Sequence, residues 1–200
     1  MNALYLIQQA GQLMLMPRAH KRNLGTSYDT IASHSFHVSI IALILAKMEG
    51  LSDADAYKAS SMALLHDLAE ARTGDHDFVA KNYNECDETK AIDDQFKDLE
   101  FANPFHDLLD EYEERSSTIT HIVKDADILA QVFHERVLMR QGNKLAEQWY
   151  IAGKTIRNPA FATASAKTII DRMDTSNPNE RWWIEFVDNN FSQKNLTGEK

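Results

Sequence analysis

The sequence predicts an all-α fold, a compact multi-helix bundle, and three observations lead to this class. The 200 residues include only 7 glycines and 4 prolines, so few positions interrupt regular structure. Apolar residues recur at helical spacing along most of the chain. No segment shows the alternation of apolar and polar residues that a half-buried strand requires. We expect residues 1–200 to form a single domain, because this length is typical of one domain with a sizeable core.

The first two predicted helices are separated by a polar connection. One helix covers residues 3–16 and ends at Pro17, because proline disfavours helical backbone in the residue before it. The second begins near Asp29 or Thr30, either of which is a suitable N-cap, and ends at Gly50.

A third helix begins at Ser52 or Asp53 and ends near residues 73–74. A loop through residues 75–78 follows it. Residues 88–101 form a more polar helix.

The remaining helices lie in the second half of the chain. Asn103-Pro104 begins a short helix with proline in its first turn. Further helices are predicted over residues 117–139, 144–153 and 159–173. A last helix from about Asn179 carries Trp182, Trp183, Phe186 and Val187. We interpret its two tryptophans as core or dimer contacts.

Composition and charge indicate a soluble cytoplasmic domain and do not exclude a small anionic substrate, provided that a cation lies in its site. Cys86 is the single cysteine, which excludes an intramolecular disulfide and fits a reducing compartment. No apolar run approaches the roughly 20 residues of a membrane span, and residues 1–5 lack the basic start of a secretory signal. The formal net charge of −9 argues against nucleic-acid binding through phosphate contacts.

The pair His66-Asp67 carries the strongest chemical signal, because it lies in an apolar run that is predicted to be helical. Burying a carboxylate beside an imidazole is costly unless something compensates it, and a metal ion would do so. On one helix the two residues would lie about 100° apart, so both could reach one ion. Glu70 is one turn further on and shares their face.

Two other predicted helices offer residues that complete such a site. His34 and His37 lie one turn apart on the second helix, and either could face the pair. Asp127 lies in an apolar stretch, whereas Asp125 follows Lys124 and can face solvent. Two imidazoles and two carboxylates suit a divalent transition metal, namely Mn, Fe, Co, Ni or Zn. Such a site supports metal-assisted hydrolysis.

The order His34, His66-Asp67, Asp127 resembles the H…HD…D signature of the HD-domain metal-dependent phosphohydrolases. The surrounding residues resemble the 5'-deoxynucleotidase group of that superfamily over roughly residues 10–140. The segments that carry the resemblance are Arg18, Ser33-His34-Ser35, residues 65–70, Thr73-Gly74-Asp75 and residues 124–127.

The resemblance implies a role for each matching residue. The metal ligands would be His34, His66, Asp67 and Asp127. Glu70 would orient or deprotonate the attacking water, and Asp75 would assist at the substrate or donate a proton. Arg18 would hold the 5'-phosphate, since a guanidinium matches phosphate oxygens, and Lys81 would add positive charge. A homodimer is also implied.

Three positions depart from the family pattern. Ser33 stands where an acidic residue usually precedes the histidine, and Ala19 stands where a tryptophan often lies near the sugar. His76-Asp77 replaces the more usual Leu-Pro. These changes bear on the substrate and leave the metal residues intact.

Simpler interpretations compete for several of these residues. Asp75 could equally be a turn residue. Arg18, like Lys21 and Arg22, could belong to an exposed basic loop. We interpret His37 as a packing residue. The dipeptides His76-Asp77 and His106-Asp107 repeat the central motif but are expected to be solvated surface.

The sequence therefore predicts a metal-dependent phosphohydrolase that removes phosphate from (deoxy)nucleoside 5'-monophosphates. One alternative keeps the metal and changes the substrate, as in HD phosphodiesterases or guanosine-tetraphosphate hydrolases. The other is a nucleotide sensor that binds without turnover.

Overall fold

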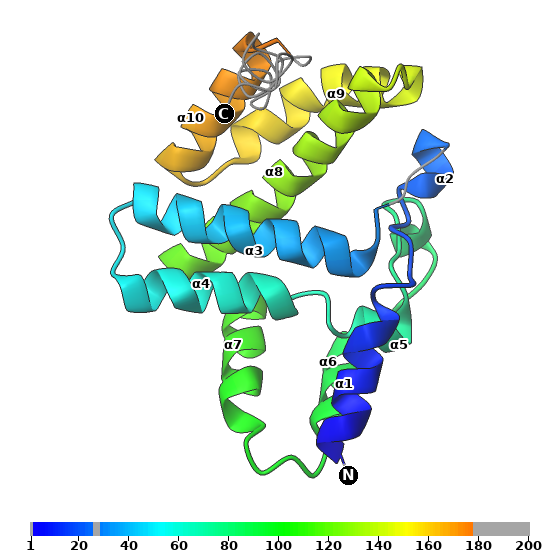
Figure 1. Cartoon of the computed structure of the whole chain (residues 1–200), viewed down its shortest axis with the longest axis vertical. Coiled ribbons are helices and arrows are strands. Elements are labelled where there is room, and N and C mark those ends of the chain that lie inside the picture. The colour runs from blue at the N-terminus through cyan, green and yellow to red at the C-terminus, as the bar shows by residue number, and fades with distance from the viewer. Residues whose placement is uncertain (1, 26–28, 178–200) are drawn as a thin grey trace, which may run out of the picture.

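Helices account for nearly all regular structure in the computed structural model, which describes residues 2–25 and 29–177 (Figure 1). Within these residues the only extended pairing is an isolated bridge between Pro17 and Thr30. The all-α prediction is confirmed. The helices are α1 (Asn2–Gln12), α2 (Lys21–Leu24), α3 (Ile31–Met48), α4 (Asp53–Leu65), α5 (Glu70–Thr73), α6 (Glu88–Phe96), α7 (Asn103–Glu114), α8 (Thr118–Arg140), α9 (Lys144–Arg157) and α10 (Ala164–Thr175), with 3₁₀ turns at Ala80–Asn82 and Asn158–Ala160.

The core lies where α3 packs against α4 and α8; α3 and α4 lie side by side, and α8 crosses behind α3 (Figure 1). Small residues allow these three helices to approach closely, and larger apolar side chains fill the space between them. The fully buried residues at this contact include Ala42, Ala59, Ala126, Val38, Leu45, Met62, Ile122 and Leu129. Because α3, the end of α4 and α8 converge, polar residues at their meeting point are held on a rigid frame.

Three of the predicted helix starts are confirmed by capping hydrogen bonds. Thr30 caps α3 by accepting from the backbone N–H of Ser33 at 3.2 Å, and the Ser33 hydroxyl accepts from the N–H of Thr30 at 2.8 Å. Ser52 caps α4 by accepting from the backbone N–H of Asp55, and Ser117 caps α8 by accepting from the backbone N–H of Thr120. Each cap satisfies backbone donors that a helix N-terminus leaves open.

The predicted continuous helix up to residues 73–74 is wrong, because α4 ends at Leu65. Residues 66–69 form turns with hydrogen bonds to the third preceding residue, such as Leu68 N–H to Leu65 O at 2.9 Å. The short helix α5 follows and ends before Gly74, whose φ of 77° favours glycine. His66 and Asp67 therefore lie on a turn, and the 100° helical spacing does not apply to them.

Other boundaries differ from the predictions by several residues. The helix predicted over 88–101 ends at Phe96 as α6, and α7 extends for 12 residues up to Glu114. The helix predicted over 144–153 continues to Arg157 as α9. The last predicted helix, from about Asn179 with its two tryptophans, lies outside the described residues.

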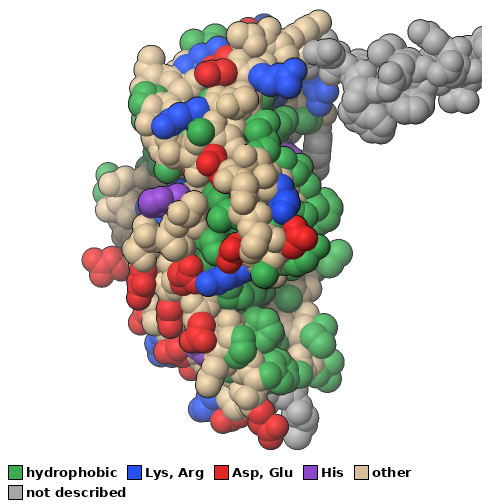
Figure 2. All heavy atoms as spheres, turned by 90° about the vertical axis from the view of Figure 1, so that its left-hand side faces the viewer, with side chains coloured by type: hydrophobic (Ala, Val, Ile, Leu, Met, Phe, Trp, Pro, Cys, Tyr) green, Lys and Arg blue, Asp and Glu red, His purple; other side chains and the backbone are tan. Residues whose placement is uncertain are grey.

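The outer face of α3 exposes several apolar residues. Among the described helices, α3 has the length and mean hydropathy of 1.5 that crossing a membrane would need, but half of it is buried inside the bundle. In Figure 2, hydrophobic side chains gather along the right-hand side of the view, and acidic side chains gather at the lower left of the view. The large apolar residues exposed on α3 and α4 are Phe36, Ile40, Ile44, Met48, Tyr57 and Leu64. This surface is one candidate for a contact with another protein.

Asp125 has a structural role that the sequence did not indicate. Its side chain is 2% exposed, in contrast to the solvent-facing position expected for it. The carboxylate accepts hydrogen bonds from Ala162 N at 3.1 Å, from Thr163 N at 2.8 Å and from Thr163 Oγ1 at 2.7 Å. Asp125 thus ties α8 to the start of α10. Lys124 pairs instead with Asp127, with Nζ 2.7 Å from Oδ2.

Replacing Asp125 by alanine should destabilise the protein by about 3 kcal/mol, because buried donors lose their acceptor. Chemical unfolding followed by circular dichroism measures this change. The exposed Asp171→Ala on α10 is the control and should lie within about 0.5 kcal/mol of the wild type. Equal stability of the two variants would contradict the structural role of Asp125.

Candidate metal centre

Residues from three helical segments converge on one partly buried point. His34 comes from α3, His66 and Asp67 from the turn after α4, and Asp127 from α8. His34 Nε2 lies 3.1 Å from Asp127 Oδ1 and 3.7 Å from Asp67 Oδ2. His66 Nε2 lies 3.2 Å from Asp67 Oδ1. One ligand atom from each of His34, His66 and Asp127 lies within 4.8 Å of the others, a spacing that could hold a metal ion.

The two imidazoles present nitrogens suited to a metal. His66 Nδ1 lies 2.7 Å from the carbonyl oxygen of Ala63, so this nitrogen carries the proton and Nε2 faces the carboxylates. His34 is 3% exposed, and its Nε2 is a buried polar atom without a hydrogen bond. An imidazole nitrogen buried beside two carboxylates fits a divalent cation. The residues present therefore fit the metal that the sequence predicted.

The electrostatics of Asp127 favour its charged form. Burial alone would raise the pKa of this carboxyl, but contact with His34 and the charges of Lys124 and His66 hold the pKa well below its ordinary value. A carboxylate in this state is a suitable metal ligand.

Arg18 lies among three carboxylates beside the same point. Its Nη1 donates a hydrogen bond to Asp67 Oδ2 at 3.0 Å, and its Nε lies 3.5 Å from Asp75 Oδ2. Nη1 also lies 3.9 Å from Glu70 Oε2. Arg18 is 9% exposed, so the interpretation as an exposed basic loop does not hold for it. Lys21 and Arg22 are exposed. A buried guanidinium next to the metal residues can meet an anionic group that enters the site.

Glu70 is an acid whose pKa is strongly raised. Burial, together with the charges of Asp67 and Asp75, raises the pKa of its carboxyl to about 9. Its Oε2 is a buried oxygen without a hydrogen-bond partner. A cation beside it would favour the ionised form. Glu70 is therefore an acid whose proton depends on what occupies the site.

Asp75 is a turn residue, which is one of the two interpretations that the sequence left open, and it also lies at the candidate site. Its Oδ2 accepts a hydrogen bond from the backbone N–H of Ala19 at 2.8 Å, which fixes the turn after Gly74. The same residue lines the cavity that contains the metal residues. Lys81 belongs to the 3₁₀ turn Ala80–Asn82, is exposed, and also lines this cavity.

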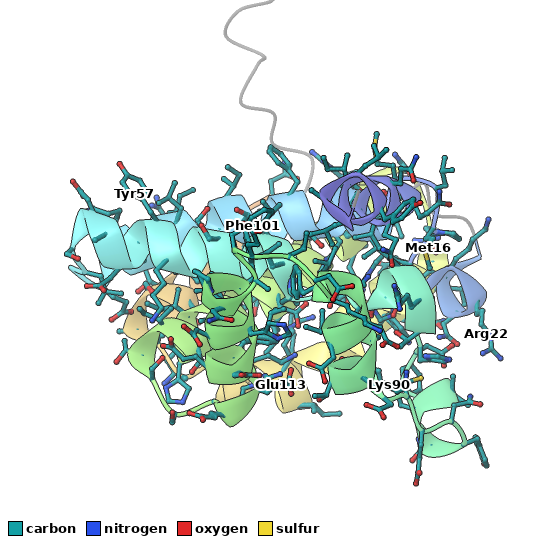
Figure 3. The ribbon with its side chains drawn as sticks, turned by 90° about the horizontal axis from the view of Figure 1, so that it is seen from below. Met16, Arg22, Tyr57, Lys90, Phe101 and Glu113 are labelled. Atoms are coloured by element: carbon teal, nitrogen blue, oxygen red, sulfur yellow. The ribbon has the colours of Figure 1, made fainter. Side chains whose placement is uncertain are left out.

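A cavity of about 370 Å³ joins these residues. Its lining includes seven of the eight predicted site residues, namely Arg18, His66, Asp67, Glu70, Asp75, Lys81 and Asp127. The eighth, His34, does not line the cavity but contacts the lining residue Asp127. Glu113 of α7 also lines the cavity and lies on the side of the molecule opposite Tyr57 of α4 (Figure 3).

Sequence reasoning missed further lining residues, notably His20, Phe78, Gln131 and Arg157. Gln131 is one helical turn from Asp127, a spacing that could have indicated it. Arg157 comes from a different helix, and no local pattern connects it to the site.

The residues interpreted as surface or packing have mixed outcomes. Asp77 was expected to be solvated, which is wrong: it is 3% exposed and accepts hydrogen bonds from Val79 N and Ala80 N. His106 is half-buried, with its ring 5.1 Å from that of Phe96, whereas Asp107 is exposed as expected. His37 packs against Phe133 at 5.5 Å, as expected.

Comparison with known proteins identifies the class to which the fold and this site belong. Residues 10–168 match the HD domain family, and the chain belongs to it. The chain is 27% identical over 188 residues to the 5'-deoxynucleotidase HDDC2 of Dictyostelium discoideum, an alignment that covers 86% of this chain and 98% of that protein.

Solved structures show the same similarity. A crystal structure described as genomics APC5600 is 32% identical, with a TM-score of 0.73, covering 91% of this chain and 98% of its own. The PH0347 protein of Pyrococcus horikoshii OT3 is 28% identical, with a TM-score of 0.66 and coverage of 86% and 96%. Together with the His/Asp group, these relatives support a metal-dependent HD hydrolase.

Replacing His66 or Asp127 by alanine should weaken binding of a divalent transition metal more than about 100-fold. Loss of a residue that only supports a ligand costs 10–100-fold, and loss of the ligand itself costs more. Calorimetric titration of metal-stripped protein with Mn²⁺ or Zn²⁺ measures this. His37→Ala, one turn from His34, is the matched control and should keep wild-type affinity. Equal losses in all three variants would refute the assignment.

Proposed function

We propose that the protein removes phosphate from nucleoside or deoxynucleoside 5'-monophosphates in a metal-dependent reaction. The observation that carries this proposal is the position of Arg18, a buried guanidinium beside the His/Asp group at one end of the cavity. A phosphate at this point would meet both a metal and a planar cation, the two groups that phosphoryl transfer uses most. The named 5'-deoxynucleotidase relative supports the same substrate class.

The proposed metal residues are His34, His66, Asp67 and Asp127, and the ion is Mn, Fe, Co, Ni or Zn. When bound, it supplies a Lewis acid for the phosphate and activates water. The other roles belong to side chains around it.

Arg18 neutralises the charge that spreads over the phosphoryl oxygens during the reaction. Its present ion pairs with Asp67, Glu70 and Asp75 must partly yield when a phosphate enters, because one guanidinium has a limited number of donors. Lys81 adds positive charge at the mouth of the cavity.

We assign proton transfer to Glu70 and Asp75, two acids that lie near Arg18. With a cation in the site Glu70 is ionised, so its buried oxygen can accept a hydrogen bond from the attacking water and take its proton. Asp75 passes a proton from solvent water to the leaving 5'-oxygen. The backbone N–H of Ala19 holds the Asp75 carboxyl in place for this step.

Purified protein with added Mn²⁺ or Co²⁺ should release inorganic phosphate from nucleoside 5'-monophosphates. Asp67→Ala should lower kcat/KM by about 1000-fold or more, because it removes a metal ligand and the partner of Arg18. The exposed Asp171→Ala should leave activity unchanged.

Product analysis separates this function from its alternatives. Wild-type activity in Asp67→Ala would refute the assignment. A monophosphate product from a diester or a polyphosphate would favour an HD phosphodiesterase or a guanosine-tetraphosphate hydrolase. Tight nucleotide binding without any product would favour a sensor.

We further propose that the protein is a cytoplasmic homodimer that does not bind nucleic acid. The apolar face of α3 and α4 offers a surface for a second copy, and the net charge of −9 opposes polyanion binding. Light scattering should give twice the 22.8 kDa chain mass. A monomer mass at micromolar concentration would contradict the dimer.

A further inference from the structure

The cavity extends well beyond the metal residues, along one face of α8. Asp127 and Gln131 both line it and are one turn apart on that helix. Glu135 follows one turn later and contacts the lining residue Arg157. At 1.5 Å per residue, the lining residues Asp127 and Gln131 are about 6 Å apart along the axis. A phosphate held near Asp127 would therefore have the rest of its molecule beside Gln131 and Arg157.

The α8 side of this far end is a fixed polar wall. Glu135 is 4% exposed, and Arg157 Nη1 lies 3.2 Å from its Oε2. Gln131 Nε2 donates a hydrogen bond to Glu135 Oε1 at 3.2 Å. Since Glu135 accepts from both neighbours, the amide of Gln131 is oriented with its nitrogen toward Glu135. The amide oxygen is then the Gln131 acceptor available to a ligand.

Arg157 is held in place by other residues of its own helix, α9. Its guanidinium carbon lies 5.1 Å from the centre of the Tyr150 ring, and Gly153 leaves the space that its side chain occupies. The polar wall is therefore preorganised, which lowers the cost of binding.

Another part of the cavity lining is aromatic. Phe78, in the loop after Asp75, is 56% exposed, and its ring lies 5.7 Å from that of Trp149. The His20 ring lies 5.4 Å from the same tryptophan, and its Nδ1 is a buried atom without a hydrogen-bond partner. Burial and the charge of Arg18 lower the pKa of His20 to about 4, so its imidazole is neutral. Phe78 thus offers a ring face, and His20 offers a neutral polar atom.

We propose that this far end binds the nucleobase, with Phe78 against the face of the base and Gln131 hydrogen-bonded to its edge. The inference rests on the proposed function and names the part of the substrate that the metal residues do not reach. Ring stacking accepts any base, whereas the Gln131 amide oxygen accepts from base N–H groups. Glu135 and Arg157 are positioning residues for Gln131.

The proposal is tested by comparing a nucleotide with its fragments. Wild-type protein should hydrolyse deoxyadenosine 5'-monophosphate with a kcat/KM at least about tenfold above that for deoxyribose 5-phosphate, which lacks a base. Phe78→Ala and Gln131→Leu should each raise KM for the nucleotide about tenfold with little change in kcat. Neither should alter kcat/KM for deoxyribose 5-phosphate.

Two matched variants control for indirect effects. Tyr83→Ala removes another exposed aromatic residue shortly after the same loop, and Gln148→Leu removes an exposed glutamine on α9. Neither residue lines the cavity, and both variants should behave as the wild type. Unfolding temperatures of all four variants confirm that they are folded.

Binding of deoxyadenosine, followed by calorimetry, makes the test independent of turnover. This nucleoside lacks phosphate and should bind the wild type, with affinity reduced about tenfold in Phe78→Ala and Gln131→Leu. If no phosphate ester is hydrolysed, the proposed function fails, but the nucleoside titration still decides the base site. Equal use of deoxyribose 5-phosphate and the nucleotide, or unchanged nucleoside affinity in both variants, would overturn the inference.

Discussion

The concentration of negative charge around Arg18 is the constraint on which the rest of this structure depends. Asp67, Glu70 and Asp75 all face this one buried guanidinium, and Asp67 also lies beside His34 and His66. Burial, reinforced by the charges of Asp67 and Asp75, raises the pKa of Glu70 to about 9. A divalent ion would relieve the repulsion among these carboxylates, which Arg18 balances only in part. The fold holds these acids together because Asp67 lies on the turn between α4 and α5, Glu70 begins α5, and Asp75 follows the end of α5.

Local chemistry allowed much of the fold to be predicted from the sequence. Thr30, Ser52 and Ser117 cap helices through hydrogen bonds to neighbouring residues, so their roles can be read without knowing the tertiary structure. The end of α4 at Leu65 could not be read in this way. Residues 66–69 contain no glycine or proline to signal a helix end, and their turn geometry depends on where His66 and Asp67 must point. The burial of Asp125 depends on Thr163, which is 38 residues away.

The candidate site shows the same division between local and distant information. The order of His34, His66-Asp67 and Asp127 predicted a group that the structure does bring together, although its chemical role stays a prediction. Their order along the chain was informative because the resemblance supplied the pattern. Arg157 and Phe78 reach the cavity from α9 and from a loop, so only the packing of those segments reveals them. The residues proposed to hold the phosphate are therefore more predictable from the sequence than the residues that line the rest of the cavity.

The central claim is that these four residues bind one divalent metal ion. A crystal structure of the protein loaded with Mn²⁺ or Zn²⁺, with anomalous scattering recorded at the metal edge, tests it most directly. The account predicts one strong peak about 2.0–2.2 Å from ligand atoms of His34, His66, Asp67 and Asp127. A structure in which these side chains are well ordered and the peak is absent, or lies at other residues, would contradict it.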